Sequence, residues 1–153
     1  MRCVKWGLAA LLCGLLVIQL VPYGRHHDNP PVVAEPLWDS AQTRELAVRA
    51  CFDCHSNETV WPWYSNVAPV SWLVQRDVDQ GRDHLNYSEW NRPQEGEESA
   101  ETVRDGSMPP RSYLLTHPAR LTDSELAALA DGLAATFGGE GGGEEGEGEE
   151  EDD

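Results

Sequence analysis

Cys51 and Cys54 stand three residues apart, and His55 directly follows the second cysteine. On a helix, side chains three and four residues apart lie on the same face, so the two thiols and the imidazole are expected to extend together. The C-x-x-C-H spacing is typical of covalent attachment of a c-type haem. Both thiols would form thioether bonds to the two vinyl groups of one porphyrin, and His55 would be the proximal iron ligand. The spacing therefore predicts haem c as the cofactor.

Met108 is the only methionine after the initiator, and Pro109 and Pro110 follow it. Two prolines exclude a continuous helix, so the thioether is expected on a stiff loop. Ligation by His and Met is the cytochrome c arrangement, which raises the reduction potential. We therefore expect Met108 to be the distal iron ligand, with His84 and His117 as alternatives.

Four aromatic residues follow the cysteine motif: Trp61, Trp63, Tyr64 and Trp72. Flat apolar rings are suitable walls for a porphyrin. We expect Trp61, Trp63 and Tyr64 to line the cofactor site. Ordinary core packing is the alternative for each ring.

Two other uses of the cysteine pair are weaker. Zinc would need Cys51 and Cys54 with two of His55, His84 and His117, but this second pair lacks the short spacing of a structural site. A thioredoxin-like dithiol would follow a strand, whereas the preceding segment is predicted to be helical. The only other thiols are at the N-terminus, so no disulfide framework explains the pair.

Three helices are expected to position these residues. The first opens at Asp39, which has the capping-box spacing with Gln42. Its inward face contains residues at helical spacing, namely Ala47, Ala50, Cys51 and Cys54.

A second helix is predicted from Ser71 to about Asn86, and the polar residues 86–99 that follow are predicted to be a surface loop. The third helix is predicted over residues 123–137, between a Thr122–Glu125 capping box and Gly138. The chain contains no sustained alternating β-branched run. We therefore expect a small all-α domain of about three helices with long loops.

The N-terminal segment contains 18 uncharged residues from Trp6 to Tyr23, a length typical of a transmembrane helix. No small-x-small triplet closes this run, which favours an uncleaved anchor over a signal peptide. Arg2 and Lys5 precede the run and only Arg25 follows it. The positive-inside tendency therefore places the N-terminus in the cytoplasm and the domain outside.

Four regions result: an anchor over residues 1–24, a Pro-rich linker over 25–38, the domain over 39–137 and an acidic tail over 138–153. The tail contains nine acidic and no apolar side chains, so it is predicted to be disordered. Without those nine charges the net charge is −7 rather than −16. Such an acidic domain is a poor partner for nucleic acid.

Two runs, CFDCHSNETVWPWYSNVAPVSWLVQRDVDQGRDHLNYSEW and MPPRSYLLTHPARLTDSEL, resemble the bacterial haem-binding domain family. Its members share C-x-x-C-H-S-N-x-T-x-W-P-W-Y, G-R-x-x-x-N-x-S-x-W and M-P-x-x-x-Y-x-x-x-H-P. The likeness covers roughly residues 39 to 135. It implies a cytochrome c-like domain behind an N-terminal anchor, with haem held by Cys51, Cys54 and His55. By likeness to c-type cytochromes, it also implies Met108 as the distal ligand.

These features together predict a single-pass protein of the bacterial inner membrane with its haem domain in the periplasm. We expect an electron carrier that exchanges electrons with redox proteins at the membrane, swinging between them on the Pro-rich linker. A haem sensor or a small peroxidase-like enzyme is the alternative, and it requires an open distal site. The sequence offers no convincing distal acid-base pair, which favours a carrier over an enzyme. A haem-free zinc module is the least supported alternative.

Overall fold

The computed structural model describes residues 2–110, 113 and 121–138. In this part of the chain it contains six α-helices and one 3-10 helix: α1 (Arg2–Ile18), α2 (Ala41–Ala50), α3 (Phe52–His55), η1 (Trp63–Asn66), α4 (Val70–His84), α5 (Ser99–Arg104) and α7 (Asp123–Phe137). The same residues form no β-strand, only one isolated parallel bridge between Ala34 and Glu89. The all-α prediction is thus confirmed for the described residues, although they contain more helices than the three that were expected in the domain.

The cysteine motif lies across a break between two helices. α2 begins after Ser40, whose hydroxyl accepts a hydrogen bond from the Thr43 amide at 3.1 Å. The predicted cap at Asp39 is therefore wrong by one residue. Cys51 leaves helical geometry at φ −122°, and α3 restarts at Phe52. The predicted single helix through both cysteines is therefore interrupted at the first of them.

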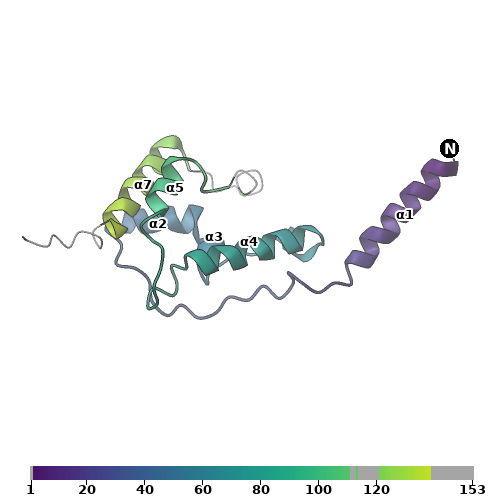
Figure 1. Cartoon of the computed structure of the whole chain (residues 1–153), viewed down its shortest axis with the longest axis horizontal. Helices are drawn as coiled ribbons and strands as arrows, with labels where there is room; N and C mark the ends of the chain where they lie inside the picture. The colour runs from purple at the N-terminus through teal and green to yellow at the C-terminus, as the bar shows by residue number, and fades with distance from the viewer. Residues whose placement is uncertain (1, 111–112, 114–120, 139–153) are drawn as a thin grey trace, which may run out of the picture.

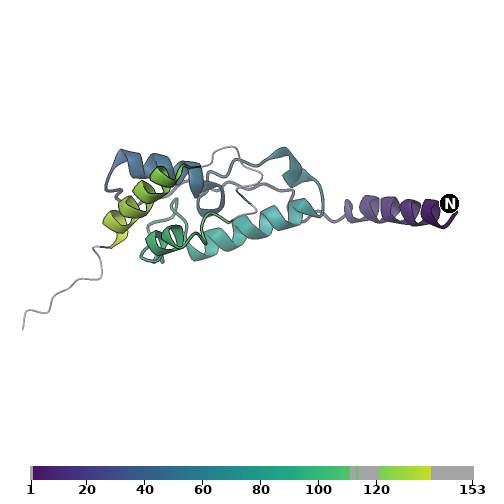
Figure 2. The same cartoon turned by 90° about the horizontal axis from the view of Figure 1, so that it is seen from above.

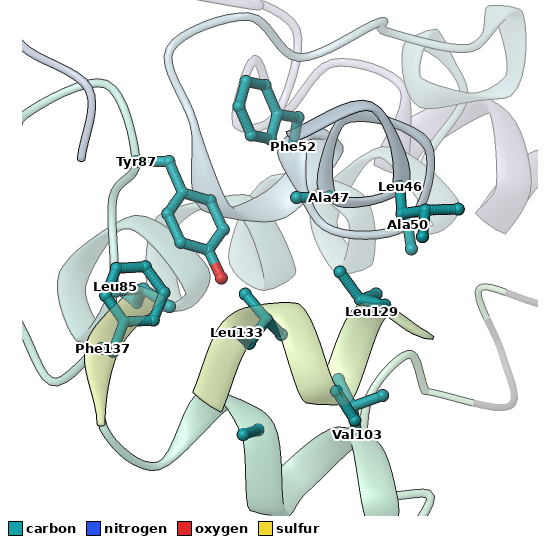
Figure 3. Packing of buried hydrophobic residues seen from close by; sticks show 12 residues of the cluster. Leu46, Ala47, Ala50, Phe52, Leu85, Tyr87, Val103, Leu129, Leu133 and Phe137 are labelled. Carbon is teal, nitrogen blue, oxygen red and sulfur yellow. The ribbon is translucent and has the colours of Figure 1, made fainter. Parts of the chain in front are cut away.

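The core lies where α7 packs on α2 and α5 (Figure 3). Leu129 and Leu133 of α7 are completely buried there. Aromatic rings extend this core: Phe137 stacks on Trp90 at 4.8 Å between ring centroids, and Tyr87 stacks on Phe52 at 5.6 Å. The core of this short domain therefore depends on aromatic side chains, which bury the most area per residue.

The helices predicted from periodicity and caps agree closely with the structure. α4 lies one residue earlier at its start, and two at its end, than the predicted helix. α7 has the predicted bounds. Thr122 and Glu125 form its capping box, and Gly138 is the residue at its C-terminal cap.

The predicted surface loop over residues 86–99 is wrong at its beginning. Asn86, Tyr87 and Ser88 are at most 1% exposed. Their polar atoms are hydrogen-bonded inside the domain, as the Asn86 side chain shows by donating to Asn57 Oδ1 at 2.9 Å. Internal partners of this kind offset the cost of burying polar groups. The end of the predicted loop also differs, because α5 begins at Ser99.

α1 projects away from the other helices and has no buried residue (Figures 1 and 2). No helix within the described ranges is both long and apolar enough to cross a membrane. α1 ends at Ile18, so the last five residues of the apolar run from Trp6 to Tyr23 lie outside the helix. The predicted transmembrane helix is therefore not supported.

Residues 19–38, here called the strap, run back from α1 alongside α4 to α2 (Figure 1). The strap is extended, as the linker over residues 25–38 was predicted to be, but it lies on the domain. Gln19 pairs with both backbone groups of Ala68, at 2.9 and 3.0 Å. Farther along, the Val33 amide donates to Ser88 O at 2.8 Å. A segment with such contacts is not a free tether, so the predicted swinging motion loses its basis.

Candidate functional site

A cavity of about 890 Å³ lies between the cysteine motif, α4 and the loop that contains Met108. Its volume is in the range of cofactor and ligand pockets. Cys51, Cys54 and His55 line it together, and Met108 lines it as well. The structure thus brings the predicted haem-attaching thiols and both predicted iron ligands to one cavity.

The imidazole of His55 is oriented by the backbone. Its Nδ1 atom lies 3.0 Å from the carbonyl oxygen of Leu85. A carbonyl only accepts hydrogen bonds, so Nδ1 carries the proton and Nε2 keeps a free lone pair. Burial lowers the pKa of His55, which favours the neutral ring. A neutral imidazole with one nitrogen tied to a carbonyl is a ready metal ligand.

Both motif cysteines are free and partly exposed. Burial raises the pKa of the Cys51 thiol to about 12 and that of the Cys54 thiol to about 11. Both groups are therefore neutral thiols at physiological pH. Zinc binds cysteine as the thiolate, so two neutral thiols do not by themselves select zinc.

Met108 lies on a loop held to α5. Its amide donates to Thr102 O at 2.9 Å, and its side chain is 40% exposed. The loop is non-helical, as Pro109 and Pro110 predicted. The thioether thus lies at the cavity without being enclosed in the core.

A hydrogen bond joins two further residues of the cavity lining. The Tyr113 hydroxyl donates to Asp53 Oδ2 at 2.9 Å, and both residues line the cavity. Asp53 also accepts the amide of Val60 at 2.9 Å through its other oxygen. This carboxylate, between the two cysteines, therefore connects three segments around the cavity. The sequence patterns did not identify Asp53 as a site residue, although its position between Cys51 and Cys54 pointed to the site.

Of the three aromatic residues predicted to line the site, one lines the cavity and two do not. Tyr64 lines the cavity. Trp61 stacks on His27 of the strap, with 4.6 Å between ring centroids, and its indole N–H donates to Asn29 at 3.2 Å. Trp63 is 80% exposed. The structure thus brings only Tyr64 of these three rings to the cavity wall.

The apolar wall of the cavity comes from α4. Leu73, Val74 and Val78 line it at helical spacing. His84, the alternative distal ligand, also lines the cavity, but its side chain is 78% exposed. His117 lies outside the described residues. Within those residues, no group of three His, Cys, Asp or Glu side chains is arranged to hold a metal ion.

The cavity volume, the two adjacent thiols and the oriented imidazole fit a haem group. Comparison with known proteins agrees with this geometry. The family model described as "Haem-binding domain" matches residues 13–135, which include the whole strap and the whole cavity lining. No curated protein and no solved structure matches the chain. The match covers well over half of the sequence, so the chain belongs to the haem-binding domain family.

Proposed function

We propose that this protein is a c-type haem protein that carries single electrons, with haem attached through Cys51 and Cys54 and ligated by His55 and Met108. The observation that carries the proposal is the convergence of these four side chains on one cavity. The family match supports haem as the cofactor.

Attachment requires no oxidant. Each cysteine S–H would add across one vinyl group, so that sulfur bonds to one vinyl carbon and hydrogen to the other. Cys51 lies in the helix break and Cys54 in α3, which gives the two sulfur atoms separate backbone supports. Bound haem supplies an iron centre that alternates between the ferrous and ferric states.

Two ligand positions of the iron filled by protein side chains would favour electron transfer over catalysis. His55 would occupy one position through Nε2, because Nδ1 is bonded to Leu85. Met108 would occupy the other. The peroxidase or sensor alternative needs that position open, and displacement of Met108 by carbon monoxide would favour it.

We propose redox proteins at the membrane as the partners, and the periplasmic side of the inner membrane as the location. The support is α1, whose large apolar side chains are exposed: Val4, Trp6, Leu8, Leu11, Leu12, Leu15, Leu16 and Val17. An apolar surface of this kind marks contact with a membrane or a protein. Fractionation of cells and extraction of the membranes with alkaline carbonate test this part separately.

The first experiment is a reduced pyridine-haemochrome spectrum with an intact mass, measured on the full chain produced with a cytochrome c maturation system. We expect a c-type spectrum and the added mass of one haem. The double variant Cys51→Ala/Cys54→Ala should lose both. Cys13→Ser, in exposed α1, is the matched control and should keep both. A colourless wild-type chain would refute covalent haem binding, and a c-type haem without a reversible redox couple would refute the carrier function.

A further inference from the structure

The strap contacts the domain along its whole length. At one end Gln19 pairs with Ala68, and at the other Glu35 binds the guanidinium of Arg44 in α2 through two bonds of 2.7 Å. Between them, the Asn29 side chain donates to Thr59 O at 2.9 Å. The strap therefore passes beside the turn over residues 56–59, which directly follows the proximal histidine.

Arg82 of α4 joins the strap to this turn. On the side of the turn, its Nε donates to Ser56 O at 2.8 Å and its Nη2 to Thr59 Oγ1 at 2.9 Å. On the side of the strap, its Nη1 donates to Asp28 O at 3.0 Å and its Nη2 to Asn29 Oδ1 at 3.1 Å. One planar guanidinium thus binds both segments, a geometry that lysine does not reproduce.

Arg82 also lies close to the proposed cofactor site. Gly81, the residue before Arg82, packs against the carbonyl of Cys54 so closely that a Cβ atom would overlap it. α4 and α3 therefore approach each other at the haem-attaching cysteine. Arg82 itself is half-buried, and its guanidinium bonds to Ser56 O, two residues after Cys54. A cation with reduced access to water acts on a nearby redox centre more strongly than an exposed one.

We propose that Arg82 is a positioning residue of the haem site, which clamps the turn after His55 to the strap and holds a fixed positive charge beside Cys54. The strap is then a part of the site and not a tether. The effect on haem rests on the proposed function, whereas the clamp itself does not. A positive charge favours the ferrous over the ferric state, so Arg82 raises the reduction potential.

The test uses the full chain with four single substitutions. Arg82→Gln removes the charge and the fork, and Arg82→Lys keeps only the charge. Asn29→Ala removes a strap partner and leaves Arg82 in place. Arg76→Gln removes a positive charge from an exposed position on the same helix and is the matched control. The readouts are the potential of the haem and hydrogen exchange of residues 19–38.

We expect Arg82→Gln to lower the ferrous-to-ferric ratio about tenfold at a fixed ambient potential, which is about 59 mV for one electron. Arg82→Lys should keep the potential close to that of the wild type, while exchange in the strap rises in both Arg82 variants and in Asn29→Ala. Arg76→Gln should change neither readout by a comparable amount. A wild-type potential or a wild-type strap exchange in Arg82→Gln would overturn the proposal.

Two further measurements distinguish a failure of the proposed function from a failure of the proposed clamp. The haemochrome spectrum of the wild type is recorded first, and its absence refutes the proposed function. The exchange comparison is repeated in the Cys51→Ala/Cys54→Ala background, where it tests the clamp without haem. If Arg82→Gln does not fold, Arg82→Lys and Asn29→Ala still decide, because unchanged strap exchange in both would overturn the clamp.

Discussion

The Nδ1 atom of His55 donates to the carbonyl oxygen of Leu85 at 3.0 Å. A second hydrogen bond, between backbone atoms, joins the same two segments. The Tyr87 amide donates to His55 O at 2.8 Å, so His55 is bonded through both its ring and its backbone to the segment over residues 85–87. Asn86, between these two partners, is 1% exposed. The segment that orients the imidazole therefore contains a buried polar side chain.

Replacing Asn86 with Ala should destabilise the domain by about 2–4 kcal/mol. The substitution leaves the Ser88 amide and Asn57 Oδ1 without their Asn86 partners. A buried polar group that loses its partner costs about 1–3 kcal/mol. Urea unfolding of the full chain measures the loss. Asn91→Ala, at an exposed position, is the control and should cost no more than about 0.5 kcal/mol. Equal losses in the two variants would show that the network does not hold the segment.

Replacing Met108 with Ala should open the distal iron position. Without a thioether, the ferrous haem should bind carbon monoxide and the potential should fall, since Met ligation raises it. Absorption spectra under carbon monoxide and a redox titration measure both effects. Leu73→Ala alters another exposed side chain of the cavity lining and is the control. Unchanged spectra and potential in Met108→Ala would show that another residue is the distal ligand.

The sequence predicted well those elements that depend on interactions between residues close together in the chain. The bounds of α7 follow from its capping box and from the spacing of its apolar residues. Cys51, Cys54 and His55 lie close together because they are neighbours in the sequence. The burial of Asn86 and Ser88 could not be predicted, because their partners lie about 30 residues away in Asn57. Pairwise hydrogen bonds between distant polar residues leave no periodic signal.

The predicted free linker and the predicted position of Trp61 differ from the structure for a related reason. A Pro-rich segment without helical period has the same composition whether it is free or docked. Its docking depends on individual partners, such as Arg82 for Asn29 and the ring of Trp61 for His27. The aromatic ring that was expected at the porphyrin is thus used to hold the strap.

The acid stability of the domain should depend on Glu125. Its hydrogen bond with Arg49, together with the cap bonds from Thr122, lowers the pKa of the carboxyl from 4.5 to about 2 in the folded state. Because the folded-state pKa is depressed, this contribution is complete above pH 4.5 and is lost as the pH falls towards 2. Glu125→Gln should therefore be less stable than the wild type at pH 6, and the difference should vanish near pH 2. Unfolding curves over this range measure the effect, with Glu101→Gln, at an exposed position of α5, as the control. A constant difference at all pH values would contradict the assignment to the ion pair.

Replacing Gly81 with Ala should weaken haem attachment as well as the fold. An added methyl group meets the carbonyl of Cys54, which belongs to the backbone and cannot rotate away. Overpacking of this kind costs about 1–3 kcal/mol, and α3 must move away from α4 to relieve it. The displacement shifts Cys54 relative to His55 and Arg82, so the yield of c-type haem per polypeptide should fall. Gly14→Ala in α1 has open space around the new methyl group and improves helix propensity, so it should lose nothing. Haemochrome absorbance relative to intact protein mass gives the yield, and urea unfolding gives the stability. A Gly81→Ala chain with wild-type yield and stability would mean that the contact between α3 and α4 is looser than the structure has it, and that the haem-attaching turn does not depend on this glycine.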